Sequence, residues 1–172
     1  MPELFGLCQL EGFTKTWRVT DVPYPGVIWH RYANAVTLPV LHSIFGANWP
    51  PPEKRPGEQV FVFRDPDKYQ RPFDPTDHPA AWLSLTQDQF DARNYYMSRG
   101  VWPDEHGQGL GQFMRRWAEL YVRQQGGDAL TIWVHASNEE HFENVANDEY
   151  WELSAIAKDP IAVQFIHEID DA

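Results

Sequence analysis

The chain has 172 residues, 42% hydrophobic and 15% aromatic, a composition that predicts one globular domain over residues 1–172 and excludes a disordered chain. Its 25 acidic and 14 basic residues give a formal net charge of −11, which disfavours binding to nucleic acids and to anionic membranes. A single cysteine, Cys8, excludes an intramolecular disulfide, and no apolar run approaches the roughly 20 residues of a membrane span, so we expect a cytoplasmic protein.

The first half of the chain is expected to contain strands and one short helix. Residues 14–22 are rich in β-branched and aromatic side chains and end before Pro23, which is typical of a strand. A helix is expected over residues 37–46, because Thr37 can cap its start and Gly46 can end it. Further strands are expected at residues 59–64, 80–86 and 94–102.

The second half alternates helices with strands. Apolar residues recur at helical spacing from Leu110 to Gln125, and Gly126 follows as a stop signal. The apolar run at residues 129–134 is typical of a strand buried on both faces, and a strand, a helix and a second strand of these lengths form a right-handed parallel crossover. A short acidic helix starting near Glu139 and a final hairpin of strands at residues 150–157 and 161–169 complete a predicted mixed α/β domain.

Residues 101–111, with the sequence VWPDEHGQGLG, place three glycines at the start of the helix predicted from Leu110. Glycine lets the backbone approach a ligand closely, and the first amides of a helix have no partners within the helix. Together with the positive end of the helix dipole, these amides form an anion site. The spacing does not match the Gly-x-Gly-x-x-Gly dinucleotide fingerprint, and the chain has no Gly-Lys-Ser or Gly-Lys-Thr sequence of a P-loop. An ordinary glycine-rich turn is the alternative interpretation.

The same stretch resembles the acyl-coenzyme A (acyl-CoA) motif of the Gcn5-related N-acetyltransferase (GNAT) superfamily. That motif reads Val, four residues, Arg or Gln, two residues, Gly, one residue, and Gly or Ala. In this chain Val101, His106, Gly109 and Gly111 stand at those positions. The order of the predicted elements is also similar from about residue 14 onwards, and Asn138 follows the next strand, as an asparagine commonly does in that superfamily.

The resemblance implies a single GNAT-like domain with a mixed, mostly antiparallel sheet of six to seven strands flanked by helices. It implies that the sheet is splayed between its fourth and fifth strands, here residues 94–102 and 129–134. Acetyl-CoA or another acyl-CoA would be the cosubstrate, with its pantetheine arm paired to the backbone near Val101 and positioned by Asn138. Its pyrophosphate would be held by the backbone amides of His106, Gly107, Gln108, Gly109, Leu110 and Gly111.

The activity implied by the resemblance is transfer of an acyl group, most simply acetyl, to a primary amine of a small molecule or a protein. Two departures leave alternatives open. His106 replaces the usual Arg or Gln, and Val145 and Ala146 stand where many members have a tyrosine that protonates the departing thiolate. The nearest tyrosine, Tyr150, is expected in the next strand. A catalytically inactive binding or regulatory module is therefore the second hypothesis, and a nucleic-acid-modifying relative is the third.

His135, at the end of the fifth predicted strand, is the preferred general base, because an imidazole titrates near neutral pH. A structural hydrogen bond is the alternative role for this histidine. Tyr95, Tyr96 and Ser98 are rival catalytic residues whose facing depends on the register of their strand. No metal is expected, because histidines and carboxylates do not recur at ligand spacing. The acceptor and the oligomeric state stay open, with a homodimer as one option, and the loop at residues 65–79 is expected to help set acceptor specificity.

Overall fold

The computed structural model describes residues 3–22, 57–68, 81–101, 109–135, 139–158 and 161–169. The helix expected at residues 37–46 lies outside these ranges, as does the loop expected at residues 65–79 beyond its first four residues. Neither of the two helices in the described ranges is long and apolar enough to cross a membrane.

Within the described part of the chain, eight strands form one sheet in the order β1-β2-β3-β4-β5-β6-β8-β7. The strands are β1 (Gly6–Cys8), β2 (Trp17–Val22), β3 (Glu58–Arg64), β4 (Ala81–Gln87), β5 (Asn94–Val101), β6 (Ala129–His135), β7 (Glu152–Lys158) and β8 (Ile161–Glu168), and the helices are α3 (Leu110–Gln124) and α4 (Glu139–Ala146). All neighbouring strands are antiparallel except β5 and β6. The predicted mixed, mostly antiparallel α/β sheet is confirmed.

The sheet has one strand more than the six to seven that were expected. The additional strand is β1, which pairs with β2 at the edge of the sheet. It has only three residues and begins at Gly6 with a φ of 69°, so its sequence is too short to show the alternation by which a strand is recognised. The neighbouring strand β2 begins at Trp17, three residues later than expected.

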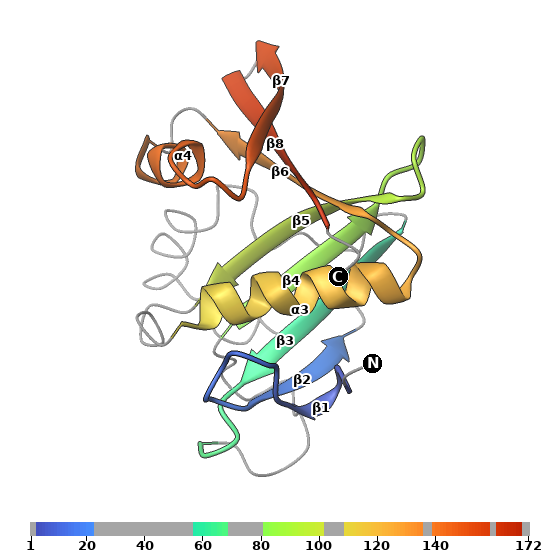
Figure 1. Ribbon diagram of the computed structural model, residues 1–172, viewed down its shortest axis with the longest axis vertical. Helices are drawn as coiled ribbons and strands as arrows, with labels where there is room; N and C mark the ends of the chain where they lie inside the picture. The colour runs from blue at the N-terminus through green and yellow to red at the C-terminus, as the bar shows by residue number, and fades with distance from the viewer. Residues whose placement is uncertain are drawn as a thin grey trace, which may run out of the picture.

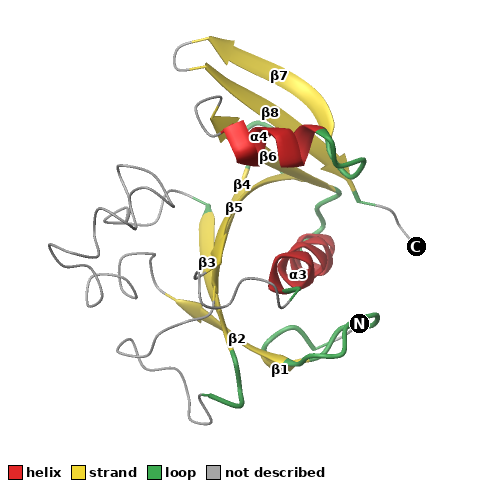
Figure 2. Cartoon of the chain, turned by 90° about the vertical axis from the view of Figure 1, so that its left-hand side faces the viewer, coloured by secondary structure: helices red, strands yellow, loops and turns green. Residues whose placement is uncertain are grey.

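Helix α3 covers one face of the sheet (Figures 1 and 2). Side chains alternate between the faces of a strand, so every second residue of β3, β4, β5 and β6 points toward this helix. The buried residues on this side include Phe61, Phe63, Leu83, Leu85, Tyr95, Met97, Leu130 and Ile132 from the sheet, and Leu110, Phe113, Met114, Trp117 and Ala118 from the helix. Trp117 is fully buried, its ring centroid lies 4.7 Å from that of Phe61, and its Nε1 donates a hydrogen bond of 2.7 Å to the carbonyl of Leu4.

The predicted parallel crossover from β5 through α3 to β6 is confirmed, and the two strands it joins separate almost at once. They pair at only three positions, Asn94–Tyr96 with Ala129–Thr131, whereas β4 and β5 pair over seven. Figure 1 shows β5 and β6 diverging beyond this contact. At the closed end the Thr131 hydroxyl donates a buried hydrogen bond of 2.6 Å to Oδ1 of Asn94. The splay expected between the fourth and fifth predicted strands is therefore present.

The last two strands form the expected hairpin, but their order in the sheet differs from their order in the chain. Strand β8 lies between β6 and β7 and pairs with β6 along seven residues. Strand β7 pairs with β8 and has a register shift between Leu153 and Ala155. The long β6–β8 ladder gives the far side of the splay a rigid wall.

Gly127 lies in the tight connection between α3 and β6 and provides a test of this packing. A Cβ at this position would be 2.5 Å from Cγ1 of Val122 and 2.9 Å from Cε1 of Tyr95, both buried. Gly127→Ala should therefore lower the free energy of unfolding by about 1–3 kcal/mol, measured by urea denaturation. Gly111→Ala is the matched control, because a Cβ there meets no described residue within 4 Å and alanine favours a helix. Equal losses in the two variants would contradict the packing described here.

Candidate functional site

The open end of the splay exposes backbone groups that strands normally pair with each other. Beyond Tyr96 and Thr131, the facing edges of β5 and β6 make no ladder with each other. Their outer edges stay paired, β5 with β4 and β6 with β8. An extended ligand that carries amide groups can therefore pair with the inner edge of β5 in the manner of an added strand.

Helix α3 starts at Leu110, as predicted, close to this opening. Its N-cap is Gly109, with a φ of 73° in the left-handed region that other residues rarely adopt. No side chain of the described residues caps this helix, and its first turn contains no acidic residue. The first amides of α3 therefore have no side-chain cap among the described residues, and together with the positive end of the helix dipole they are suited to an anion. Residues 102–108, which include His106, Gly107 and Gln108, lie outside the description.

Arg99 of β5 ties the start of this helix to the strand. Its Nη1 donates a hydrogen bond of 2.7 Å to the carbonyl of Gly111. Burial, followed by the nearby guanidinium of Arg115, lowers the pKa of Arg99 from its ordinary value. The bond fixes the helix start beside the open end of β5 and adds positive charge near the free amides.

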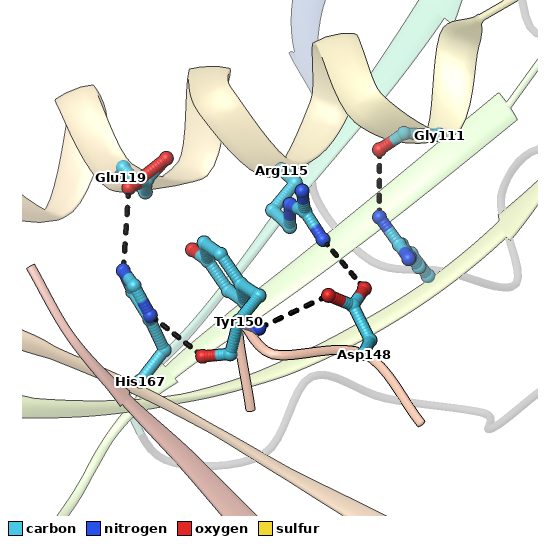
Figure 3. Close-up of polar contacts among 7 residues, drawn as sticks. Gly111, Arg115, Glu119, Asp148, Tyr150 and His167 are labelled. Atoms are coloured by element: carbon cyan, nitrogen blue, oxygen red, sulfur yellow. Dashed lines mark hydrogen bonds and ion pairs between the residues drawn. The ribbon is translucent and has the colours of Figure 1, made fainter. Parts of the chain in front are cut away.

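Tyr150 lies in the turn between α4 and β7, not in the strand where it was expected. Its backbone N–H donates to Oδ1 of Asp148 at 3.0 Å, an Asx turn that delays the start of β7 to Glu152. The ring stacks on His167 with centroids 3.5 Å apart, and the Arg115 guanidinium lies 3.9 Å from its centroid on the other side (Figure 3). Arg115 also bonds to Asp148 at 3.1 Å.

The Tyr150 hydroxyl is buried and has no hydrogen-bond partner of acceptable geometry among the described residues. Burial and, after it, the Glu119 carboxylate raise the pKa of this phenol far above its ordinary value. Glu119 lies nine residues after Leu110, which places it about 13 Å along the helix from its start. Tyr150 is thus part of a packed cluster at the middle of α3, away from the helix start.

On the face opposite α3, a polar cavity of about 380 Å³ crosses four strands of the sheet. The strand register aligns one residue from each strand in a row: Glu58 of β3, Thr86 of β4, Tyr96 of β5 and Thr131 of β6. The complete lining is Glu58, Ser84, Thr86, Tyr96, Met97, Ser98, Thr131 and Trp133. This row ends at the closed end of the splay.

The register of β5 places its three catalytic candidates on two different faces of the sheet. Tyr96 and Ser98 line the cavity, whereas Tyr95 is buried on the α3 side beside Gly127. The Tyr96 hydroxyl donates to Oδ2 of Asp88 at 3.3 Å, and burial, followed by the charge of Asp88, raises its pKa, so it stays protonated at neutral pH. The backbone of His135 pairs with Ala162 at the end of β6, while its side chain, like the whole of Asn138, lies outside the description.

Sequence reasoning missed the polar pair Glu58 and Ser84. The Ser84 hydroxyl donates a buried hydrogen bond of 2.6 Å to Oε2 of Glu58, and the two residues are only 4% and 8% exposed. Glu58 was missed because a glutamate directly before an apolar run indicates a solvated strand end. The signal that could have found the pair is a serine at position 84, in the middle of an apolar strand.

A second cavity, of about 510 Å³, adjoins the first and shares Tyr96 and Thr131 with it. Its lining includes four carboxylates and one guanidinium, from Asp88, Asp91, Asp128, Glu168 and Arg93. Arg93 pairs with Asp128 at 2.7 Å. The surplus of carboxylates makes this region negative, but nowhere in the described ranges do three or more acidic, histidine or cysteine side chains gather as metal ligands would.

Comparison with protein-family models and with curated protein sequences gives no match. Comparison with solved structures gives many. A protein from Klebsiella pneumoniae assigned as an acyl-CoA N-acyltransferase has a TM-score of 0.60 at 14% identity, covering 90% of this chain and 98% of its own. A protein from Desulfovibrio desulfuricans assigned to the GNAT family has a TM-score of 0.55 at 14% identity, covering 90% of this chain and 99% of its own.

A third structure is the spermidine N-acetyltransferase of Vibrio cholerae in complex with CoA and spermine. Its TM-score is 0.55 at 10% identity, and the match covers 89% of this chain and 95% of that one. At these identities the similarity shows the fold. The chain has the acyl-CoA N-acyltransferase fold that the resemblance at residues 101–111 implied.

The hydroxyls of Tyr150 and Tyr96 should contribute differently to the free energy of unfolding, which denaturation experiments can measure. Tyr150→Phe should leave the free energy of unfolding unchanged or raise it by up to about 1 kcal/mol, because it removes a buried hydroxyl without a partner and keeps the ring stacked. Tyr96→Phe should lower it by about 0.5–1.5 kcal/mol, because the bond to Asp88 is lost. A larger loss in Tyr150→Phe than in Tyr96→Phe would show that Tyr150 has a partner in solution.

Proposed function

We propose that this protein is an N-acyltransferase that moves the acetyl group of acetyl-CoA, or the acyl group of another acyl-CoA, to a primary amine. The observation that carries the proposal is the β5–β6 contact of only three residue pairs, which opens beside the glycine-capped start of α3. Support comes from the N-acyltransferase fold, and from the Vibrio cholerae enzyme, whose structure holds CoA.

The described residues fit the cosubstrate at both ends of its pantetheine arm. A Cβ at Gly109 or at Gly111 would meet no described residue within 4 Å, which supports a pyrophosphate position beside this backbone. The amides of residues 106–111 would hold this group, and the inner edge of β5 near Val101 would pair with the amides of the arm. Asn138 would position the arm between the separating strands.

Acyl transfer requires the acceptor amine to lose a proton, its nitrogen to attack the thioester carbonyl, and the carbon–sulfur bond to break, which yields an amide and a free thiol. His135 would accept the proton from the amine, at the end of the strand that forms the far wall of the splay. Tyr96 and Ser98 line the cavity, which supports a role for them in contacting the acceptor. Tyr95 packs in the core, a position less suited to this role.

A binding or regulatory module without turnover is the second candidate. It is favoured by the absence of a tyrosine at positions 145 and 146, since Val145 is buried in the core and the Tyr150 hydroxyl faces the middle of α3. Both candidates bind acetyl-CoA, which would raise the melting temperature of the protein. Acyl transfer to a panel of amines, followed by mass spectrometry, separates them.

Glutamate substitutions at the two ends of α3 test the cosubstrate site. Gly109→Glu should abolish acetyl-CoA binding in calorimetry, because the side chain and its charge enter the pyrophosphate position. Gly126→Glu is the matched control, since Gly126 also has a positive φ, is also open around its Cβ, and follows the other end of the same helix. Unchanged acetyl-CoA affinity in Gly109→Glu would refute the assignment.

His135→Ala tests the general base. The variant should lose about 100-fold in kcat at pH 7, because no group is left to accept the proton of the amine, and it should retain its acetyl-CoA affinity. A variant that keeps wild-type turnover would assign His135 a structural role.

A further inference from the structure

We propose that Arg99 binds the phosphate nearest to the pantetheine arm of acyl-CoA, the proximal phosphate, and thereby makes the site prefer phosphorylated acyl donors. This inference rests on the proposed acyl transfer and adds a charged side chain to a site proposed above from backbone amides. It is carried by the position of Arg99 in the splay, by its hydrogen bond to the first turn of α3, and by the balance of charge around it.

Arg99 lies between the two parts of the proposed cosubstrate site. It follows Tyr96, the last residue of β5 that pairs with β6, by three positions, so it stands on the open part of the strand. Its side chain extends to the α3 side of the sheet, where Nη1 donates a hydrogen bond of 2.7 Å to the carbonyl of Gly111. The guanidinium therefore lies beside the first turn of α3, where an arm paired with β5 would meet the helix start.

The charge of Arg99 has no carboxylate of its own. None of the ion pairs among the residues that the structure describes includes Arg99. Arg115 follows Gly111 by about one helical turn and pairs with Asp148 at 3.1 Å (Figure 3). Burial and the charge of Arg115 lower the pKa of Arg99, and the opposing charge of Asp148 does not cancel their effect. Two guanidinium groups thus share one carboxylate, and the start of α3 adds further positive potential.

A half-buried cation without an ion-pair partner favours an anionic ligand. Burial of a charge is costly in free energy unless an opposite charge and hydrogen bonds compensate it. A guanidinium has five N–H donors, so the bond from Arg99 to Gly111 leaves donors for a second acceptor. Arginine pairs with phosphate through short, charge-assisted hydrogen bonds. A positive site of this kind is a local exception in a protein with a net charge of −11.

The direction from which Arg99 reaches the helix selects one of the two phosphates in the pyrophosphate. The proximal phosphate is joined to the pantetheine arm, and the distal phosphate is joined to the adenosine. Arg99 approaches the start of α3 from β5, the strand that the arm would follow. The proximal phosphate is therefore the one that its guanidinium would contact, while the first amides of α3 bind the same pyrophosphate.

Calorimetry on the intact protein tests the inference with three thioesters. Acetyl-CoA carries the whole pyrophosphate, S-acetylphosphopantetheine keeps only the proximal phosphate, and S-acetylpantetheine has no phosphate. Arg99→Gln should weaken the binding of the first two by about tenfold or more, because a charge-assisted bond to phosphate is lost. Its affinity for S-acetylpantetheine, titrated to millimolar concentration, should equal that of the wild type.

Arg116→Gln is the matched control, since it removes the same charge from the same helix. The Arg116 side chain is 42% exposed and pairs with Glu119 at 3.9 Å, so all three affinities should stay as in the wild type. Arg99→Lys keeps the charge and should recover part of the affinity for the two phosphorylated thioesters. Added salt should weaken acetyl-CoA binding more steeply in the wild type than in Arg99→Gln, because the variant lacks one cation at the phosphate.

The outcomes separate this inference from the proposed function. Equal losses for the three thioesters in Arg99→Gln would mean that Arg99 only positions the helix start, and a loss confined to acetyl-CoA would mean that it acts beyond the proximal phosphate. Either result would overturn the inference and leave the acyltransferase assignment in place. Arg99-dependent binding of the phosphorylated thioesters without acyl transfer to any amine would overturn the acyltransferase assignment alone. No binding of any thioester to the wild type at millimolar concentration would overturn both.

Discussion

The pairing between β5 and β6 stops after three residue pairs, and the rest of the structure depends on this constraint. A parallel pair requires a crossover, and α3 provides it, so the start of this helix necessarily lies near one end of β5. The pairing stops after Tyr96 and Thr131, and the buried bond from Thr131 to Asn94 fixes the point from which the strands separate. The inner edge of β5 and the start of α3 therefore lie at the open end of the splay, whereas the row of residues across the polar cavity ends at its closed end.

Helix α3 must be packed firmly against the sheet and yet leave its first turn accessible, two requirements that usually conflict. Its inner face is packed tightly, with Trp117 fully buried among aromatic rings, and this packing holds the helix at a fixed height above the sheet. Among the described residues no side chain caps its first turn, and the bond from Arg99 to the carbonyl of Gly111 ties this turn to β5. A rigid body with an open end is suited to hold a large anionic ligand, because little conformational entropy is lost when the ligand binds.

The sequence allowed most of the fold to be predicted, because long periodic segments such as Leu110–Gln124 record which face is buried. It could not reveal β1, whose three residues are too few for a pattern, or the insertion of β8 beside β6, which depends on contacts distant in sequence. For the site, glycine spacing located the start of α3. The facing of Tyr95 and Tyr96 required the register of β5, and the Glu58–Ser84 pair appears only when β3 and β4 lie side by side.

The position of β8 has a consequence for how the protein is made. A ribosome produces β7 before β8, yet the only strand that β7 pairs with in the described sheet is β8. Until residues 161–168 have left the exit tunnel, the edge of β6 that pairs with β8 stays open. Over the same interval β7, which carries the exposed apolar side chains of Leu153 and Ile156, has no strand to pair with. The nascent chain can thus assemble the core around α3 early, but it completes the far wall of the splay only when β8 is inserted.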